Sequence, residues 1–217
     1  MRWFGGLLLF LVPLLPPWGC IGLDNPTEGT EGGEPGRARN STASLEARTR
    51  WSPDLPVDRL PGSDRVDGPL DVELGRDWRY IIIHHSGTDS GSEASFDRYH
   101  RRQRGWKGIG YDFVIGNGSG TPDGLIEVTF RWEKQITGAH AGVDRYNRHG
   151  IGICLVGDFS AGEPTNSQMK SLVALVLYLQ QSCRIPLPNI LTHRQVKQTK
   201  CPGENFPYAM FLSLLNS

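Results

Sequence analysis

The order of apolar and polar residues divides the chain into two parts near residue 78. Between residues 21 and 77, apolar residues are scattered among Gly, Pro, Asp, Glu, Arg, Ser and Thr, with neither a two-residue nor a 3.6-residue period. Such a segment buries too little apolar surface to offset the entropy lost when a chain becomes ordered. We expect residues 21–77 to form a flexible linker and residues 78–217 to form the folded domain.

Four apolar runs in the second part have the length and composition of β-strands. The runs at 79–84 and 150–157 are apolar at consecutive positions, which is typical of strands covered on both faces. Two further runs, at 110–116 and 125–130, are bounded by turn-forming residues.

Helical patterns separate these runs. One helix is expected at 92–106, and another begins at a capping box formed by Thr165 and Gln168 and continues to about residue 182 with a wide apolar face. A short helix is expected at 207–215. Strands interleaved with helices over about 140 residues indicate an α/β domain large enough for a hydrophobic core.

The first twenty residues have the pattern of an export signal. Arg2 gives a positive start, and the apolar run at 5–15 is too short to span a membrane but has the length of a signal-peptide core. Cys20 follows a small residue, as in bacterial lipoprotein signals, although Pro17 stands where such signals usually have Leu. Residues 1–20 are therefore interpreted as a signal peptide or lipoprotein signal.

The fate of this segment stays open between lipidation, simple cleavage and an uncleaved anchor. Each of the three predicts an exported protein that is periplasmic, membrane-anchored or extracellular, with a possible membrane tether through the N-terminus. The formal net charge is zero, from 23 basic and 23 acidic residues, which argues against a nucleic-acid partner.

The number of cysteines adds little to the predicted fold. If Cys20 carries a lipid, then Cys154, Cys183 and Cys201 remain. Three is an odd number, so a disulfide framework is not favoured and at least one thiol has another purpose. Cys154 lies within an apolar run and is expected to be a small buried hydrophobic residue.

Candidate chemistry is concentrated at His84, His193 and Cys201. His84 ends a predicted strand, while the other two lie eight residues apart in a polar segment. Imidazole and thiolate are ligands that zinc prefers, and three protein ligands leave a fourth position for water, as in catalytic sites. The spacing by itself is weak support, since His84 could also be a core residue and Cys201 an unrelated thiol.

From about residue 78 onwards the sequence resembles the type-2 N-acetylmuramoyl-L-alanine amidase family, most closely its peptidoglycan recognition protein branch. The matching stretches occur in family order: Ile-Ile-Ile-His-His-Ser, Gly-Ile-Gly-Tyr-Asp-Phe-Val-Ile, Thr-Gly-Ala-His-Ala-Gly, Gly-Ile-Gly-Ile-Cys-Leu-Val-Gly-Asp-Phe and Thr-His-Arg-Gln-Val-Lys-Gln-Thr-Lys-Cys-Pro-Gly. The resemblance implies a central mixed β-sheet flanked by helices, with a Zn²⁺ site at one end of a substrate groove.

The same resemblance implies zinc-dependent hydrolysis of the amide bond between N-acetylmuramic acid and L-alanine, with peptidoglycan or muropeptides as partner and a monomeric protein. It assigns His84, His193 and Cys201 as the zinc ligands. Alternation along a strand places His84 and His85 on opposite faces, so only one of the two can point at the metal.

Four further residues receive expected roles from the resemblance. Tyr111 matches a tyrosine beside the metal, and its hydroxyl would stabilise the oxyanion together with Thr199. His140 matches a histidine of the substrate groove. His85 is expected either to pack and support the site or to lie on the substrate side with His140.

Two alternatives remain. The first is a peptidoglycan-binding module without catalysis, in which the cysteine ligand is typically replaced, whereas Cys201 is present here. The second is a structural zinc domain, which requires a fourth protein ligand. His100 and His149 are expected to be ordinary surface residues.

Overall fold

The computed structural model of the protein describes residues 65–216, which form one mixed β-sheet covered by helices. The strands are β1 (Val66–Asp67), β2 (Tyr80–His85), β3 (Phe113–Ile115), β4 (Ile126–Val128), β5 (Gly150–Leu155) and β6 (Ile190–Thr192). The helices are α1 (Glu93–Arg104), α2 (Phe130–Glu133), α3 (Asp144–His149), α4 (Asn166–Cys183), the 3-10 helix η2 (Leu187–Asn189), α5 (His193–Val196) and α6 (Tyr208–Leu215).

The six strands lie in the order β1-β4-β3-β5-β2-β6. Strand β2 pairs in parallel with β5 and with β6, β5 pairs in parallel with β3, and β3 pairs antiparallel with β4. The prediction of a central mixed sheet flanked by helices is therefore confirmed. Because β2, β5 and β6 are parallel, their carboxyl ends meet at one edge of the sheet, where polar side chains that follow the strands gather.

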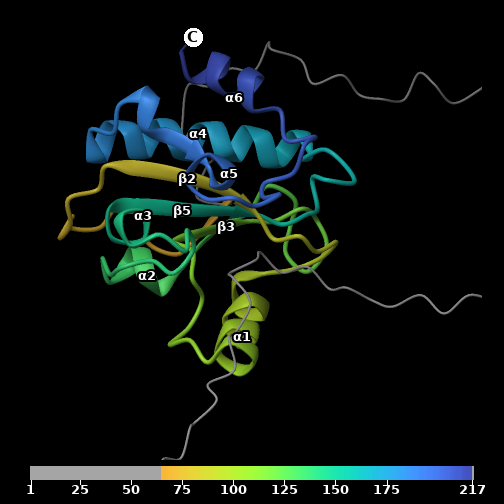
Figure 1. The fold of residues 1–217 in the computed structure, drawn as a ribbon, viewed down its shortest axis with the longest axis horizontal. Helices are drawn as coiled ribbons and strands as arrows, with labels where there is room; N and C mark the ends of the chain where they lie inside the picture. Colours follow the sequence, from red (N-terminus) through yellow and green to blue (C-terminus); the bar gives the residue numbers. More distant parts are fainter. Residues whose placement is uncertain (1–64, 217) are drawn as a thin grey trace, which may run out of the picture.

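Helices cover the sheet on both faces (Figure 1). Helix α4 and helix α6 lie on one face, and α1, α2 and α3 lie on the other (Figure 1). The main hydrophobic cluster contains Ile81, Ile83 and the apolar side chains of α4, while a smaller cluster joins Phe96 of α1 to Tyr111 and Val114. Strands with apolar side chains on both faces need such a cover, which explains their continuous apolar runs.

The two long helices begin where their caps predict. The Ser92 hydroxyl accepts a hydrogen bond from the backbone N–H of Ser95 at the start of α1, and Thr165 and Gln168 form a reciprocal capping box at the start of α4. Helix α1 ends at Gly105, which adopts the left-handed conformation at φ 65°. Side-chain capping thus fixes both N-termini from local sequence.

Several elements were not expected from the sequence. The strand predicted at 110–116 covers only Phe113–Ile115, and the strand predicted at 125–130 covers only Ile126–Val128, because Phe130 already begins α2. Strand β6 has three residues and α5 has four, so neither is long enough to display a period. These short elements form through sheet pairing and tertiary contacts and not through propensity.

The expected domain boundary at residue 78 is wrong. Residues 65–77, the described part of the predicted linker, pack against the domain. Strand β1 pairs in parallel with β4, and Leu70 and Val72 pack against the main cluster. The indole N–H of Trp132 donates to the carbonyl of Leu70 at 3.0 Å. Local periodicity could not reveal this, because the contacts are made with residues about sixty positions away.

The predicted signal segment at 1–20 and the remainder of the predicted linker lie outside the described residues. Among residues 65–216, none of the helices is long and apolar enough to cross a membrane.

Candidate metal centre

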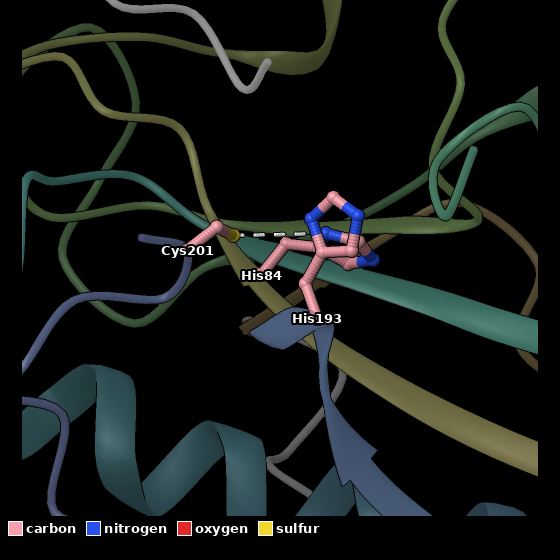
Figure 2. Close-up of side chains that lie close together, drawn as sticks. All are labelled: His84, His193 and Cys201. Carbon is pink, nitrogen blue, oxygen red and sulfur yellow. Dashed lines mark hydrogen bonds between the residues drawn. The ribbon is translucent and has the colours of Figure 1, made fainter. Parts of the chain in front are cut away.

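His84, His193 and Cys201 converge on one point (Figure 2). One potential ligand atom from each lies within 4.8 Å of the others, and the three residues are 0%, 3% and 0% exposed. In the described residues this is the single group of histidine, cysteine and acidic side chains close enough to share a metal ion. The structure therefore brings together the three residues predicted as zinc ligands.

Parallel pairing places the two histidines next to each other. Ile83 of β2 is the register partner of Thr192, the last residue of β6. His84 and His193 each follow by one position, so both lie at the carboxyl ends of adjacent strands. Their rings are 4.5 Å apart between centroids.

Cys201 reaches the same point from a loop that is held by several contacts. The backbone N–H of His85 donates to Sγ of Cys201 at 3.3 Å, and the N–H of Cys201 donates to the hydroxyl of Thr199 at 3.3 Å. Gly203 has a φ of 106°, and a Cβ there would lie 2.1 Å from the carbonyl carbon of Phe159. Only glycine allows this approach, which explains the Cys-Pro-Gly sequence.

The separation of the donor atoms fits a zinc ion. In tetrahedral zinc, Zn–S and Zn–N bonds of about 2.3 and 2.0 Å place sulfur and nitrogen roughly 3.5 Å apart. Sγ of Cys201 lies 3.8 Å from Nδ1 of His84, the contact drawn as a dashed line (Figure 2). Two imidazoles and one thiol, all buried, form a donor set suited to zinc.

His85 lies on the other face of β2, as strand alternation predicts. Its Nδ1 accepts a hydrogen bond from the backbone N–H of Phe159 at 3.1 Å, its ring packs 5.9 Å from that of Phe159, and the residue is 5% exposed. The side chain thus packs against Phe159, while the backbone N–H of His85 donates to Sγ of Cys201. These contacts are those of a packed residue, and the substrate-side role of His85 stays a prediction.

Tyr111 lies beside the cluster. Its ring is 5.2 Å from that of His84, and its body is buried in the smaller hydrophobic cluster with Phe96 and Val114. This position agrees with the place that the resemblance gives to a tyrosine near the metal. Thr199 is half-buried, and its hydroxyl oxygen is the acceptor for the Cys201 N–H.

His140 lies in a different environment from the one expected of a groove residue. It is 7% exposed, with Nδ1 3.0 Å from Nε2 of His84 and Nε2 3.2 Å from the carbonyl oxygen of Gly150. Burial lowers the pKa of His140 well below its usual value, and the neighbouring His84 acts in the same direction. Both ring nitrogens therefore face buried groups, with His140 behind the predicted ligand.

His100 was expected at the surface but is 4% exposed. Its Nδ1 accepts a hydrogen bond from the N–H of Gly110 at 3.2 Å, and its ring lies 4.7 Å from that of Trp106 and 5.9 Å from that of Tyr111. Burial lowers the pKa of His100 to about 4. The signal was available, because Phe96 and His100 are four residues apart and share one helix face. His149 is half-buried, and its Nδ1 lies 3.0 Å from the carbonyl of Asp77.

The sequence matches the family described as N-acetylmuramoyl-L-alanine amidase over residues 74–204, a span that contains all three cluster residues. Peptidoglycan-recognition protein LB of Drosophila melanogaster is 32% identical over 176 residues, covering 75% of this chain and 66% of that protein. The human N-acetylmuramoyl-L-alanine amidase is 31% identical over 147 residues, covering 62% of this chain and 23% of that protein. This chain thus spans less than two thirds of the length of these curated relatives.

Solved structures have the same fold. The N-acetylmuramoyl-L-alanine amidase LysC from Clostridium intestinale is 34% identical with a TM-score of 0.57, and the match covers 65% of this chain and 87% of that one. A mutant of Drosophila PGRP-LB in complex with tracheal cytotoxin is 29% identical with a TM-score of 0.52, covering 63% of this chain and 82% of that one.

Proposed function

The chain belongs to the N-acetylmuramoyl-L-alanine amidase family, and we propose that it is a zinc-dependent hydrolase that cleaves the amide bond between N-acetylmuramic acid and L-alanine in peptidoglycan. The convergence of His84, His193 and Cys201 is the observation that carries this proposal. Three buried donors of this kind, in a chain of this family, match the ligand set of catalytic zinc sites.

These three residues would hold the ion. Zinc with three protein ligands supplies a position for water, lowers the pKa of that water towards about 7 and polarises a carbonyl group. The protein's own contribution begins with the thiol: the backbone N–H of His85 donates to Sγ of Cys201, which favours the thiolate form that binds metal.

The hydroxyl groups of Tyr111 and Thr199 are proposed to stabilise the tetrahedral oxyanion. Tyr111 adjoins His84, and its buried ring fixes where the hydroxyl lies. The Thr199 oxygen already accepts the Cys201 N–H, so its hydroxyl hydrogen remains able to donate towards substrate. A hydroxyl donor that is already in position before the reaction, in a site shielded from water, needs little reorganisation as negative charge develops on the oxyanion.

The proposed substrates are polymeric peptidoglycan or soluble muropeptides. Support comes from similar solved structures: PGRP-LB and PGRP-LE are each seen in complex with tracheal cytotoxin, a monomeric diaminopimelic acid-type peptidoglycan. The chemistry requires a lactyl amide carbonyl that can reach the cluster.

A binding module without catalysis is the second candidate, since solved structures with this fold contain tracheal cytotoxin as a bound ligand. The complete ligand set disfavours it. A structural zinc site would need a fourth protein ligand, and the group in the described residues has three members.

Digestion of a defined muropeptide tests the proposal. Full chain loaded with zinc should release the stem peptide with a new L-alanine amino terminus, detected by mass spectrometry. The activity should disappear with a chelator and return with zinc. Retention of muropeptide without release of stem peptide would establish the binding module instead.

We further propose export, with lipidation, simple cleavage or an uncleaved anchor at the N-terminus, and a monomeric domain. Peptidoglycan lies outside the cytoplasmic membrane, and the basic start with the apolar run at 5–15 favours secretion. Mass spectrometry of the N-terminal peptide distinguishes a Cys20 whose thiol carries a diacylglycerol from an unlipidated new terminus, and an unprocessed Met1 would indicate an uncleaved anchor.

A further inference from the structure

We propose that the loop at 138–142 sets the imidazole tautomers of both predicted ligand histidines, with His140 as the positioning residue for His84. The inference rests on the proposed zinc site and assigns His140 a role behind the metal in place of a contact with substrate. Some atoms at this loop can donate a hydrogen bond and others can only accept one, and this difference determines the tautomers.

The carbonyl of Gly150 decides the direction of the first chain of hydrogen bonds. A carbonyl oxygen accepts and cannot donate, so Nε2 of His140, 3.2 Å away, carries a hydrogen. A neutral imidazole has one N–H, which leaves Nδ1 of His140 as an acceptor. Nε2 of His84, 3.0 Å from that Nδ1, must then be the donor.

His84 is thereby left with its lone pair on Nδ1. That nitrogen is the one that lies 3.8 Å from Sγ of Cys201 in the cluster. The opposite tautomer would place the Nδ1 hydrogen where a metal has to bind, and it would turn a lone pair of His140 against the Gly150 carbonyl. The hydrogen bonds that link His84 through His140 to the Gly150 carbonyl therefore keep a lone pair on Nδ1 of His84 before any metal binds.

The next residue of the loop acts in the same way on the second histidine. The carbonyl of Ala141 lies 3.1 Å from Nε2 of His193, so that nitrogen donates and the lone pair is again on Nδ1. Two consecutive residues of one loop, a side chain and a carbonyl, thus orient two ligands, one from β2 and one at the start of α5.

Asn147 of α3 holds this loop in place. Its Oδ1 accepts hydrogen bonds from the backbone N–H of His140 at 3.0 Å and from that of Ala141 at 2.8 Å. Its own carbonyl accepts the N–H of Gly138 at 2.9 Å. The Asn147 side chain therefore helps to position both orienting groups.

The direct test is ¹⁵N NMR of the metal-free full chain labelled at histidine. Protonated and unprotonated nitrogens of a neutral imidazole have well separated shifts, and a scalar coupling across the hydrogen bond should link Nε2 of His84 to Nδ1 of His140. We expect His84 and His193 to be protonated at Nε2. Protonation of His84 at Nδ1 in the wild-type chain would overturn the inference without any mutation.

His140→Phe tests the consequence for binding, because it keeps an aromatic ring but removes the acceptor. Loss of such a supporting partner typically lowers metal affinity by about 10–100-fold. The affinity is measured by competition with a chromophoric chelator, and His84 should show a mixture of tautomers in the metal-free variant. His100→Phe is the matched control, since His100 is equally buried and contacts none of the three ligands by a hydrogen bond.

Equal zinc affinity of wild type and His140→Phe, in correctly folded protein, would refute the positioning role while leaving the amidase proposal intact. Failure of the wild-type chain to bind zinc would refute the proposed function, and the tautomers of the metal-free chain would still decide the inference. If His140→Phe does not fold, the wild-type spectrum and the Asn147→Asp and Asn147→Leu pair provide the answer. The aspartate retains the accepting oxygen and should keep the wild-type affinity, whereas the leucine should lose it.

Discussion

The imidazole of His140 lies directly over the backbone of Gly152 in β5. A Cβ built on Gly152 would be 2.6 Å from both Cγ and Cδ2 of that ring, a distance that side-chain atoms do not tolerate. The absence of a side chain at position 152 therefore creates the space that allows His140 to reach His84.

Gly152→Ala should push the His140 ring away from His84 and lower both stability and zinc affinity. Overpacking of a filled interior typically costs about 1–3 kcal/mol. Urea unfolding measures the first effect and chelator competition the second. Gly162→Ala is the matched control, because nothing lies within 4 Å of the added methyl there. Unchanged zinc affinity in Gly152→Ala would show that the ring position is not critical.

Cys201→Ser should lose more than about 100-fold in zinc affinity, since even the loss of an outer partner costs 10–100-fold and here a ligand itself is changed. Stem-peptide release should fall to background. Metal content after gel filtration and the mass-spectrometric assay measure the two effects. Cys183→Ser is the control, because Cys183 is half-buried at the end of α4, and burial raises the pKa of its thiol to about 11. Wild-type turnover in Cys201→Ser would remove Cys201 from the ligand set.

Tyr111→Phe should lower kcat by about 10²-fold or more, as expected when one donor to the oxyanion is removed. The buried ring is retained, so stability and zinc content should change little. Steady-state kinetics on a soluble muropeptide separate kcat from KM. A change confined to KM would place the hydroxyl in substrate binding and not in stabilisation of the transition state.

Asp112 should make stability depend on pH. Its Oδ2 accepts the N–H of Gly152 at 2.7 Å, but burial raises the pKa of Asp112 from 3.8 to about 7. The folded state therefore binds a proton that the unfolded state releases, and this contribution is complete below about pH 4 and lost as pH rises through about 7.

Asp112→Asn should remove this dependence. Between about pH 4 and 7 the unfolding free energy of the wild-type chain should fall relative to that of the variant by up to about 1.4 kcal/mol per pH unit. Urea midpoints of both proteins across this range, without metal, give the difference. Parallel pH profiles for the two proteins would show that Asp112 keeps an ordinary pKa.

Residues 65–77 should stabilise the domain even though they resemble a linker. A chain that begins at residue 78 should be less stable than one that begins at residue 65 by about 2–4 kcal/mol, because it lacks the half-buried Val66, Leu70 and Val72. Thermal unfolding of the two chains measures this. A substitution of all three residues by serine in the longer chain should reproduce most of the loss, and equal stability of the two chains would show that the segment contributes nothing.

The sequence determined those features that depend on neighbouring residues in the chain. The continuous apolar run of β2 predicted a strand buried on both faces, and side-chain alternation along it predicted that His84 and His85 lie on opposite faces. The capping box at Thr165 predicted where α4 begins. The His-His and Cys-Pro-Gly motifs carried the resemblance to the family.

Tertiary structure alone decided how those residues meet. His84 and His193 are adjacent because β2 pairs with β6, a three-residue strand with no detectable period. His140 lies buried against His84, in a position that depends on the bare surface of Gly152 and on the Gly150 carbonyl. Periodicity records which face of an element is covered, whereas hydrogen-bond partners across strands and loops depend on contacts that form only when distant segments pack together.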